Sequence, residues 1–350
     1  MLTVKVGGRW LVGLRLTEDL SLTWRWPGDC FECSWTMQTD YGWRDGSLEA
    51  GKSVEVFDGA NRIWLGELNT PDWGSGSFTA RGLSQAAASI PAFDSGLNTT
   101  TTPATAVDTA IAQFGWNVIR DASVPTTPLT DDDTTDGINQ INTILDAAAD
   151  ERGQRWGVDA DGRLYFAADQ TVPTWQIAPG VVELGQSNAN YRSDIFVRYT
   201  RDTDATIVTE RAQWSDGGAT RTRYGFVSET VDVTTNLGPI SQPRAAEIAN
   251  GILSKCAPQP GWTDSVEVQH GEILTNGGEA APLALIRAGH VVRLHGVYDD
   301  MAYSGSMPYL DVVLGEVKWT DGQQAISLSP VDSLRGDLAS VIEDVAGSAA

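Results

Sequence analysis

The chain has 350 residues, of which 46 are acidic and 24 basic, and a formal net charge of −22 at pH 7. This length exceeds the ~100–200 residues of an ordinary domain, so we expect two or three domains with sizeable cores. A strongly acidic surface repels phosphate, and no basic stripe interrupts it, which argues against groove-seeking or sequence-specific nucleic-acid binding.

Residues 1–95 read as short strands joined by turns. Apolar and polar residues alternate strictly over Leu20–Trp26, which predicts a strand with one buried and one wet face. Pro27-Gly28-Asp29 then turns the chain. Further predicted elements are a hairpin of Val54–Phe57 and Ile63–Leu65 around a turn at 58–61, a strand at Ser77–Ala80, and a short helix at Leu83–Ile90.

Residues 96–184 read as a small α+β module. Pro103–Phe114 has proline at its first turn and Gly115 just beyond it, which predicts a helix. The stretch Thr134–Asp169 predicts a second helix, capped by Thr135 or Asp136 and ended by Gly153, followed by a hairpin. The two strands of this hairpin are Trp156–Val158 and Leu164–Phe166, with a turn over 159–162.

Strand-like segments return after residue 184. We expect strands at Asp194–Tyr199 and Arg221–Val233, with a hairpin tip near Asp216-Gly217-Gly218. An amphipathic helix over Pro243–Cys256, with Ser241 as its cap, interrupts them. The remaining predicted elements are strands at Val266–Val268, Val291–Leu294, Leu310–Leu314 and Ala325–Leu328, and a terminal helix at Leu334–Val345.

The predicted fold class is therefore mainly β and multidomain: two small tube-like β-barrel domains with a small α+β insert between them. The predicted domains are a first barrel at 1–95, the insert at 96–184, a second barrel at 185–335 interrupted by the helix at 243–256, and a C-terminal tail at 336–350.

The cysteines and histidines do not predict a metal site. Cys30 and Cys33 form a CxxC, but they lie in a strand-like segment, Cys256 stands alone, and a structural zinc site needs four ligands. His290 and His295 are five apart on a predicted strand, which points them to opposite faces, and His270 lies far from both. We interpret all six as ordinary structural residues, although no role for the Cys30/Cys33 pair follows from the sequence.

The acidic runs also favour structural interpretations. Asp131, Asp132 and Asp133 could supply half of a calcium loop, but the spaced ligands and distal glutamate are missing, so a solvated helix entry is favoured. Asp159 and Asp161 flank a turn between strands and favour a turn over a cation site. Because no nucleophile elbow, phosphate loop or zinc-protease helix occurs either, we predict no catalytic, cofactor-binding or metal-binding residues and no cofactor.

Roughly over residues 1–335, the chain resembles the tail hub proteins of long-tailed bacteriophages. The likeness lies in the order of elements: the hairpin at 54–65, the helix at 138–149 leading into Gln154-Arg155-Trp156 and the turn at 161–164, then Asp194–Val197 opening a second β-rich part. The helix at 243–256, a strand near Val266 and the closing strand at 325–328 complete that order.

The resemblance implies a non-enzymatic structural virion protein. Such a minor tail protein is the central hub of the tail tip or baseplate, where a homotrimeric ring of β-barrels joins the sixfold tail tube to the threefold tip and lets DNA pass during ejection. Its implied partners are further copies of itself, a distal tail or tail tube protein, a tape-measure protein, and tip or fibre proteins. DNA would be met only in transit, and the chain itself would not insert into a membrane.

The implied location is the tail tip of the virion. The N-terminus lacks a signal-peptide pattern and no run of 18 apolar residues occurs, so we expect synthesis in the host cytoplasm. Two other classes stay open. One is a carbohydrate-active enzyme, since 46 carboxylates make a suitably spaced pair hard to exclude; the other is a glycan-binding adhesin, since 13 tryptophans could stack on sugars.

Overall fold

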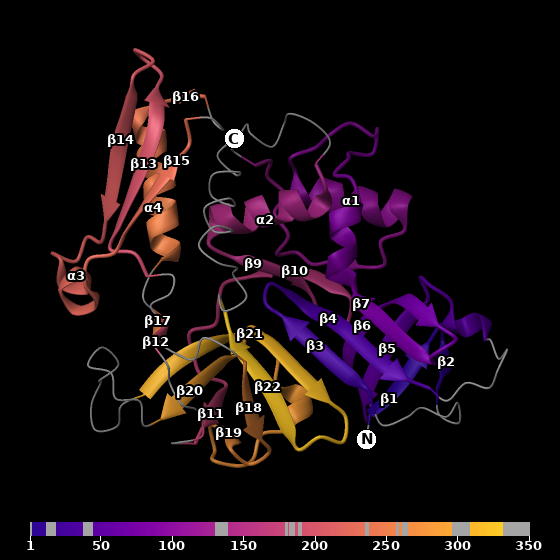
Figure 1. Cartoon of the computed structure of the whole chain (residues 1–350). Coiled ribbons are helices and arrows are strands. Elements are labelled where there is room, and N and C mark those ends of the chain that lie inside the picture. The colour runs from indigo at the N-terminus through magenta and orange to yellow at the C-terminus, as the bar shows by residue number, and fades with distance from the viewer. Residues whose placement is uncertain are drawn as a thin grey trace. The chain divides into compact units, whose positions relative to one another are not determined.

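In a computed structural model, the chain is described for residues 2–11, 19–37, 45–129, 139–178, 181, 186–187, 191–234, 238–256, 259–260, 265–295 and 309–331. The fold is mainly β with several short helices, which confirms the predicted class (Figure 1). Contacts divide the chain into two compact units. Unit 1 comprises Met1–Glu183 and Asp264–Val331, and unit 2 comprises Leu184–Thr263 and Asp332–Ala350.

Unit 1 begins with an antiparallel group of strands. These are β1 (Leu2–Val6), β2 (Arg9–Trp10), β3 (Ser21–Arg25), β4 (Gly28–Thr36), β5 (Ser53–Asp58), β6 (Asn61–Asp72) and β7 (Ser77–Gly82), in the spatial order β3-β4-β7-β6-β5-β1-β2. The predicted β5–β6 hairpin is confirmed: Asp58 faces Asn61, and Gly59 turns the chain with a φ of 59°. A short 3₁₀ turn, η1 (Gly46–Leu48), precedes β5.

The prediction of one wet face on β3 is wrong at Thr23, which is buried together with Leu22 and Trp24. β3 is an interior strand, paired with β4 on one side and with β21 (Tyr309–Thr320) on the other. Glu32 and Lys318 stand directly opposite Thr23 on these two neighbours, so Thr23 has a strand on both sides.

A second group of strands completes unit 1. It contains β11 (Trp175–Ile177), β18 (Val266–Gln269), β19 (Ile273–Thr275), β20 (Val291–His295), β21 and β22 (Ala325–Pro330), with a 3₁₀ turn η4 at Leu283–Leu285. Each strand predicted between residues 266 and 328 is found. Because β21 pairs with β3 from Glu316↔Arg25 to Thr320↔Ser21, both groups belong to one hydrogen-bonded sheet.

The domain boundaries expected from the sequence stay a prediction. The contact-based units place a division between Glu183 and Leu184, and they group Asp264–Val331 with the N-terminal strands.

The α+β insert has the predicted elements. They are α1 (Pro103–Phe114), α2 (Ile141–Arg152), β9 (Arg155–Val158) and β10 (Arg163–Ala167). The strand β8 (Ile119–Arg120) was not predicted, and the short helix expected before the insert at Leu83–Ile90 is the 3₁₀ helix η2 (Leu83–Ser89). Ile141, Ile144 and Leu145 of α2 are fully buried in a cluster with Trp116, Val158 and Leu164. The insert is tied to the first group of strands, because β9 pairs in parallel with β4 at Gly28↔Gly157 and Asp29↔Val158.

The start of α2 differs from the prediction. Within the described residues, α2 begins at Ile141 with Gln140 as its N-cap. The expected caps, Thr135 and Asp136, lie outside the described residues, as do Asp131, Asp132 and Asp133. Its end is as predicted, because Gly153 adopts the left-handed conformation that commonly closes a helix, with a φ of 58°.

Unit 2 has two layers, a small β-sheet and a helix that packs against it. Its strands are β13 (Asp194–Arg201), β14 (Ile207–Gln213), β15 (Ser228–Asp232) and β16 (Pro239–Ile240), and a separate ladder joins β12 (Gln186–Ser187) to β17 (Gln259–Pro260). The helix α4 (Gln242–Lys255) buries Ile248, Ala249 and Ile252 against Ile195, Val197 and Tyr199 of β13 (Figure 1). The predicted cap is confirmed, since Ser241 Oγ accepts a hydrogen bond from the Arg244 N–H at 3.4 Å.

The predicted strand over Arg221–Val233 is wrong in its first half. Residues Ala219–Tyr224 form a short helix, α3, and the strand β15 begins only at Ser228. The hairpin tip is also displaced: β13 and β14 are joined by residues 202–206, whereas Asp216-Gly217-Gly218 leads into α3. Both glycines have positive φ, and the Asp216 carboxylate accepts hydrogen bonds from the N–H groups of Gly218 and Thr220, which favours a helix start over a strand turn.

The predicted terminal helix at Leu334–Val345 and the predicted tail at 336–350 lie outside the described residues. Over the described part of the chain, no helix combines the length and apolar character needed to span a bilayer.

Candidate functional site

The cysteines singled out by the sequence are buried structural residues. Cys30 and Cys33 lie on β4, both as free thiols, and Cys256 follows the last turn of α4. Burial raises the pKa of all three thiols, that of Cys256 to about 11. Because the thiolate is the nucleophile and the metal ligand, these environments disfavour both kinds of chemistry.

The histidines are not brought together. The Nδ1 atom of His290 accepts a hydrogen bond from Trp175 Nε1 at 2.9 Å, and burial, assisted by the charge of Arg287, lowers the pKa of His290 to about 4. His295 instead places Nε2 3.0 Å from Gln176 Oε1, and His270 is exposed at the end of β18. Among the residues that the structure describes, no three His, Cys, Asp or Glu side chains are grouped as a metal site.

Asp159 and Asp161 form the predicted turn. One oxygen of Asp159 accepts hydrogen bonds from the N–H groups of Asp161 and Arg163, at 2.8 and 2.9 Å, and Gly162 has a φ of 80°. The Asp159 carboxylate therefore closes the β9–β10 hairpin.

One carboxyl group in unit 1 has an unusual environment. Asp29 Oδ2 accepts a hydrogen bond from the Tyr165 hydroxyl at 3.2 Å. Burial raises the pKa of Asp29 to about 6, although Arg287 and the Tyr165 bond act in the opposite direction, and burial also raises the pKa of Tyr165. Asp29 lies where β4 meets β9, at the junction between the insert and the first group of strands.

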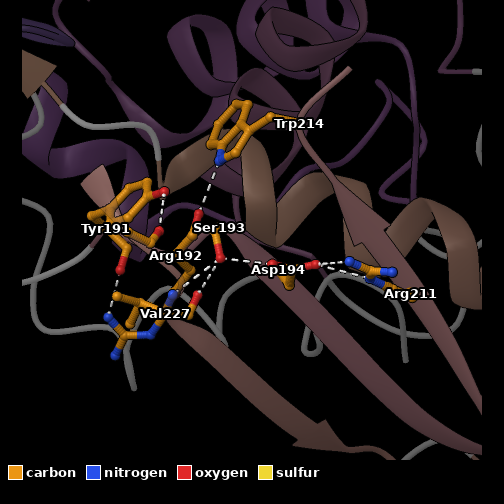
Figure 2. Close-up of polar contacts among 8 residues, drawn as sticks. Tyr191, Arg192, Ser193, Asp194, Arg211, Trp214 and Val227 are labelled. Carbon is orange, nitrogen blue, oxygen red and sulfur yellow. Dashed lines mark hydrogen bonds and ion pairs between the residues drawn. The ribbon is translucent and has the colours of Figure 1, made fainter. Parts of the chain in front are cut away.

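Unit 2 contains a second polar cluster, which the sequence did not single out. Asp194, the first residue of β13, has a fully buried side chain. Its Oδ1 accepts from Arg211, including a bond of 2.8 Å from Nε, and its Oδ2 accepts from the Ser193 hydroxyl at 2.6 Å (Figure 2). Burial alone would raise the pKa of Asp194, but these hydrogen bonds and the charge of Arg211 lower it, so the carboxylate is held in its charged form.

Neighbouring groups hold the backbone around Asp194 in place. Trp214 Nε1 donates to the carbonyl of Arg192 at 2.9 Å, and Tyr191 Oη donates to the carbonyl of Gly225 (Figure 2). Ser193 Oγ accepts from the Val227 N–H at 3.1 Å, which links the start of β13 to the segment before β15.

A pocket of about 420 Å³ opens beside this cluster. It lies where β13 begins and β14 ends, and its wall continues over the segment that leads into α3. Its lining residues are Ser193, Asp194, Gln213, Trp214, Ser215, Asp216, Gly217, Gly218 and Arg221. Unit 2 has no histidine in its sequence, so no imidazole of this unit lies beside Ser193.

The sequence carried one usable signal for this pocket. Trp214, Asp216 and the two glycines follow directly on the segment that forms β14. Interpreted as a hairpin tip, these residues suggested no site. In the structure they lead from the end of β14 into α3, and their polar and aromatic side chains line one pocket.

No protein-family model and no curated protein matches the chain. Its fold, however, is similar to solved structures. The crystal structure of the 43 kDa tail protein of prophage MuSo2 from Shewanella oneidensis aligns over 95% of this chain and 99% of its own, with a TM-score of 0.58 and 14% identity. The tail protein from Neisseria meningitidis MC58 aligns over 93% and 94%, with a TM-score of 0.55 and 15% identity. The resemblance to phage tail proteins is thereby confirmed at the level of the fold.

Proposed function

We propose that this chain is a structural, non-enzymatic component of a phage tail tip or baseplate. The observation that carries the proposal is the fold, shared over nearly the full length of both chains with a prophage tail protein and with a second tail protein. A fold can host unrelated activities, so a likeness confined to one domain would say little. Here, the alignments cover 95% and 93% of this chain and so include both of its units.

Within the tail, we assign the chain to the central hub. Three copies form a homotrimeric ring, in contact with a distal tail or tail tube protein and the tape-measure protein on one side and with tip or fibre proteins on the other. The long curved sheet of unit 1 supports this role, because its two groups of strands, joined through β3 and β21, are the kind of element that repeats around a ring.

The charge of the chain suits such a ring. DNA crosses a hub during ejection, and a net charge of −22 disfavours adhesion of the DNA backbone. At ~0.15 M salt, charges more than ~8 Å away are largely screened, so only side chains lining the channel would act on the DNA.

Native mass spectrometry of the chain mixed with its neighbouring tail proteins tests this proposal. We expect complexes that contain three copies of the chain together with at least one neighbour. A chain that stays monomeric and enters no complex with any neighbour would contradict the assignment. The isolated chain alone is not the test, because assembly can depend on the neighbours.

A further inference from the structure

The pocket of unit 2 offers a cation that the fold itself leaves without an ion pair. Arg221 lines the pocket, and no carboxylate among the described residues pairs with it. Its guanidinium carbon lies 4.4 Å from the ring centre of Phe226. A cation–π contact of this kind uses none of the N–H donors of the guanidinium as hydrogen bonds, so they can bind a carboxylate in bidentate fashion.

The two acidic side chains of the pocket have other donors, and the charge of Arg221 acts on Asp194 without a direct ion pair between the two groups. Both oxygens of Asp194 are occupied by Arg211 and Ser193. Both oxygens of Asp216 accept backbone N–H groups, from Gly218 at 2.9 Å and from Thr220 at 2.7 Å. Because each carboxylate is already stabilised by donors within the protein, an incoming anion meets Arg221 as the one lining group with unused charge-assisted donors, among the residues described.

The rest of the lining adds two other kinds of surface. Trp214 contributes an aromatic ring, whose orientation is fixed by the bond from its Nε1 to the Arg192 carbonyl. The side chains of Gln213 and Ser215, both exposed, supply an amide and a hydroxyl that can serve hydroxyl groups of a ligand. The volume of about 420 Å³ lies within the range of small-molecule pockets and is far more than a single ion requires.

A pyranose ring that carries a carboxylate has a partner for each of these groups. Its carboxylate can bind the guanidinium, its ring face can stack on the aromatic ring, and its hydroxyl groups can bind the polar side chains. An acidic peptide side chain could pair with Arg221, but it has no ring face for Trp214 and no hydroxyl groups for Gln213 and Ser215. We propose that this pocket binds a sugar acid, with the carboxylate on Arg221 and the ring against Trp214. The inference is independent of the structural role assigned above, because a tail component can bind a saccharide or lack that ability without any change in its assembly.

Saturation-transfer NMR and calorimetry with the full-length chain test the proposal. The probes are glucuronic acid, glucose as the neutral counterpart, and a short peptide ending in glutamate as an acidic ligand without a sugar ring. We expect glucuronic acid to bind and to show saturation of its ring protons, with glucose and the peptide at least tenfold weaker. Equal binding of glucose, preferential binding of the peptide, or no binding of glucuronic acid at millimolar concentration would overturn the proposal.

Substitutions assign the binding to the pocket. Arg221 is exposed, so Arg221→Gln should leave the fold intact, and we expect it to weaken glucuronic acid at least tenfold, with Arg221→Lys intermediate because the charge remains while the bidentate geometry is lost. Arg198→Gln is the matched control: Arg198 is an exposed arginine on β13, paired with Asp232 and absent from the pocket lining. Wild-type affinity in Arg221→Gln, or an equal loss in Arg198→Gln, would contradict the assignment.

Discussion

Two carboxyl groups show how the environment of one side chain decides its effect on stability. Asp29 and Asp194 both lie at the start of a long strand and are withdrawn from water. Asp194 has three donors and a lowered pKa, whereas Asp29 receives one neutral hydroxyl and has a pKa raised to about 6. The charged form is therefore stabilised in unit 2 and disfavoured in unit 1.

We predict that Asp29→Asn stabilises unit 1 above pH 6. Between the ordinary pKa of 3.8 and about 6, the native state binds more protons than the unfolded state, so the wild type loses stability as the pH rises through this range. Because Asp29 is only half-buried, we expect a gain of about 1–2 kcal/mol, less than the ~3 kcal/mol that the full pKa shift would give. Asparagine also tolerates the φ of 63° found here.

Urea unfolding of both proteins at pH 3.5 and pH 7.5 checks this prediction. The two should be nearly equal at pH 3.5, where Asp29 is neutral in both states, and should differ at pH 7.5. A variant that is less stable than the wild type at pH 7.5 would show that the Asp29 charge is favourable.

We predict the opposite sign for Asp194→Asn. The amide nitrogen of asparagine cannot accept the hydrogen bond from the Ser193 hydroxyl, and the ion pair with Arg211 is lost. We expect these losses to lower the stability of unit 2 by about 1–3 kcal/mol. The contribution of the native carboxylate is fully present above the ordinary pKa of 3.8 and is lost as the pH falls through the lowered folded value.

Hydrogen exchange of the β13 amides measures this loss locally, without assuming that both units unfold together. Asp202→Asn, on the exposed loop between β13 and β14, is the control and should leave exchange unchanged. If Asp194→Asn leaves β13 as protected as the control does, the buried ion pair contributes nothing to unit 2.

At the scale of elements, two glycines allow the strands β4, β6 and β7 to approach one another closely. Gly66 on β6 faces Gly82 on β7. A Cβ on Gly82 would lie 1.6 Å from the Cys30 carbonyl oxygen of β4, and a Cβ on Gly66 would lie 2.1 Å from the Arg81 carbonyl oxygen. Backbone, unlike a flexible side chain, cannot move aside without opening the sheet.

Gly82→Ala should therefore destabilise unit 1 by at least about 3 kcal/mol, since β4 and β7 must separate. Gly59→Ala at the β5–β6 turn is the comparison: its Cβ meets open space, and only the positive φ opposes it, at about 1 kcal/mol. Thermal unfolding of both variants tests this ordering, which would be refuted by a Gly82→Ala melting temperature at or above that of Gly59→Ala.

The elements that the sequence predicted well carry their own local signals. The helix α1 has Pro103 at its start and Gly115 at its end, and the β9–β10 hairpin has the Asp159–Gly162 turn; both were found as expected. The helix α3 was missed because its six residues are too few to show periodicity, and its start depends on Asp216 binding backbone N–H groups. Burial of Thr23 was missed because one of the two strands beside it, β21, is far away in the sequence.

The pocket of unit 2 was unpredictable for the same reason. Its lining joins the start of β13, the end of β14 and the entry to α3, and the first two come together only through the pairing of Asp194 with Gln213. Sequence spacing alone does not bring Asp194 next to Arg211 or Arg221, since a different register would place these side chains elsewhere.

At the scale of the molecule, the pairing of β21 with β3 is the feature with the widest consequence. It makes the two groups of strands in unit 1 parts of one hydrogen-bonded sheet, although the paired residues Arg25 and Glu316 lie far apart in the sequence. A sheet continued in this way fixes the second group relative to the first through backbone hydrogen bonds, which suits the ring-forming subunit that we propose.

The most direct test of the hub assignment is a cryo-electron microscopy map of an assembled tail tip that contains this chain. We predict three copies arranged as a closed ring between tail tube and tip, with the strand groups of unit 1 lining the channel. A map that places the chain on the periphery of the tail, or in a number other than three around the axis, would contradict the account.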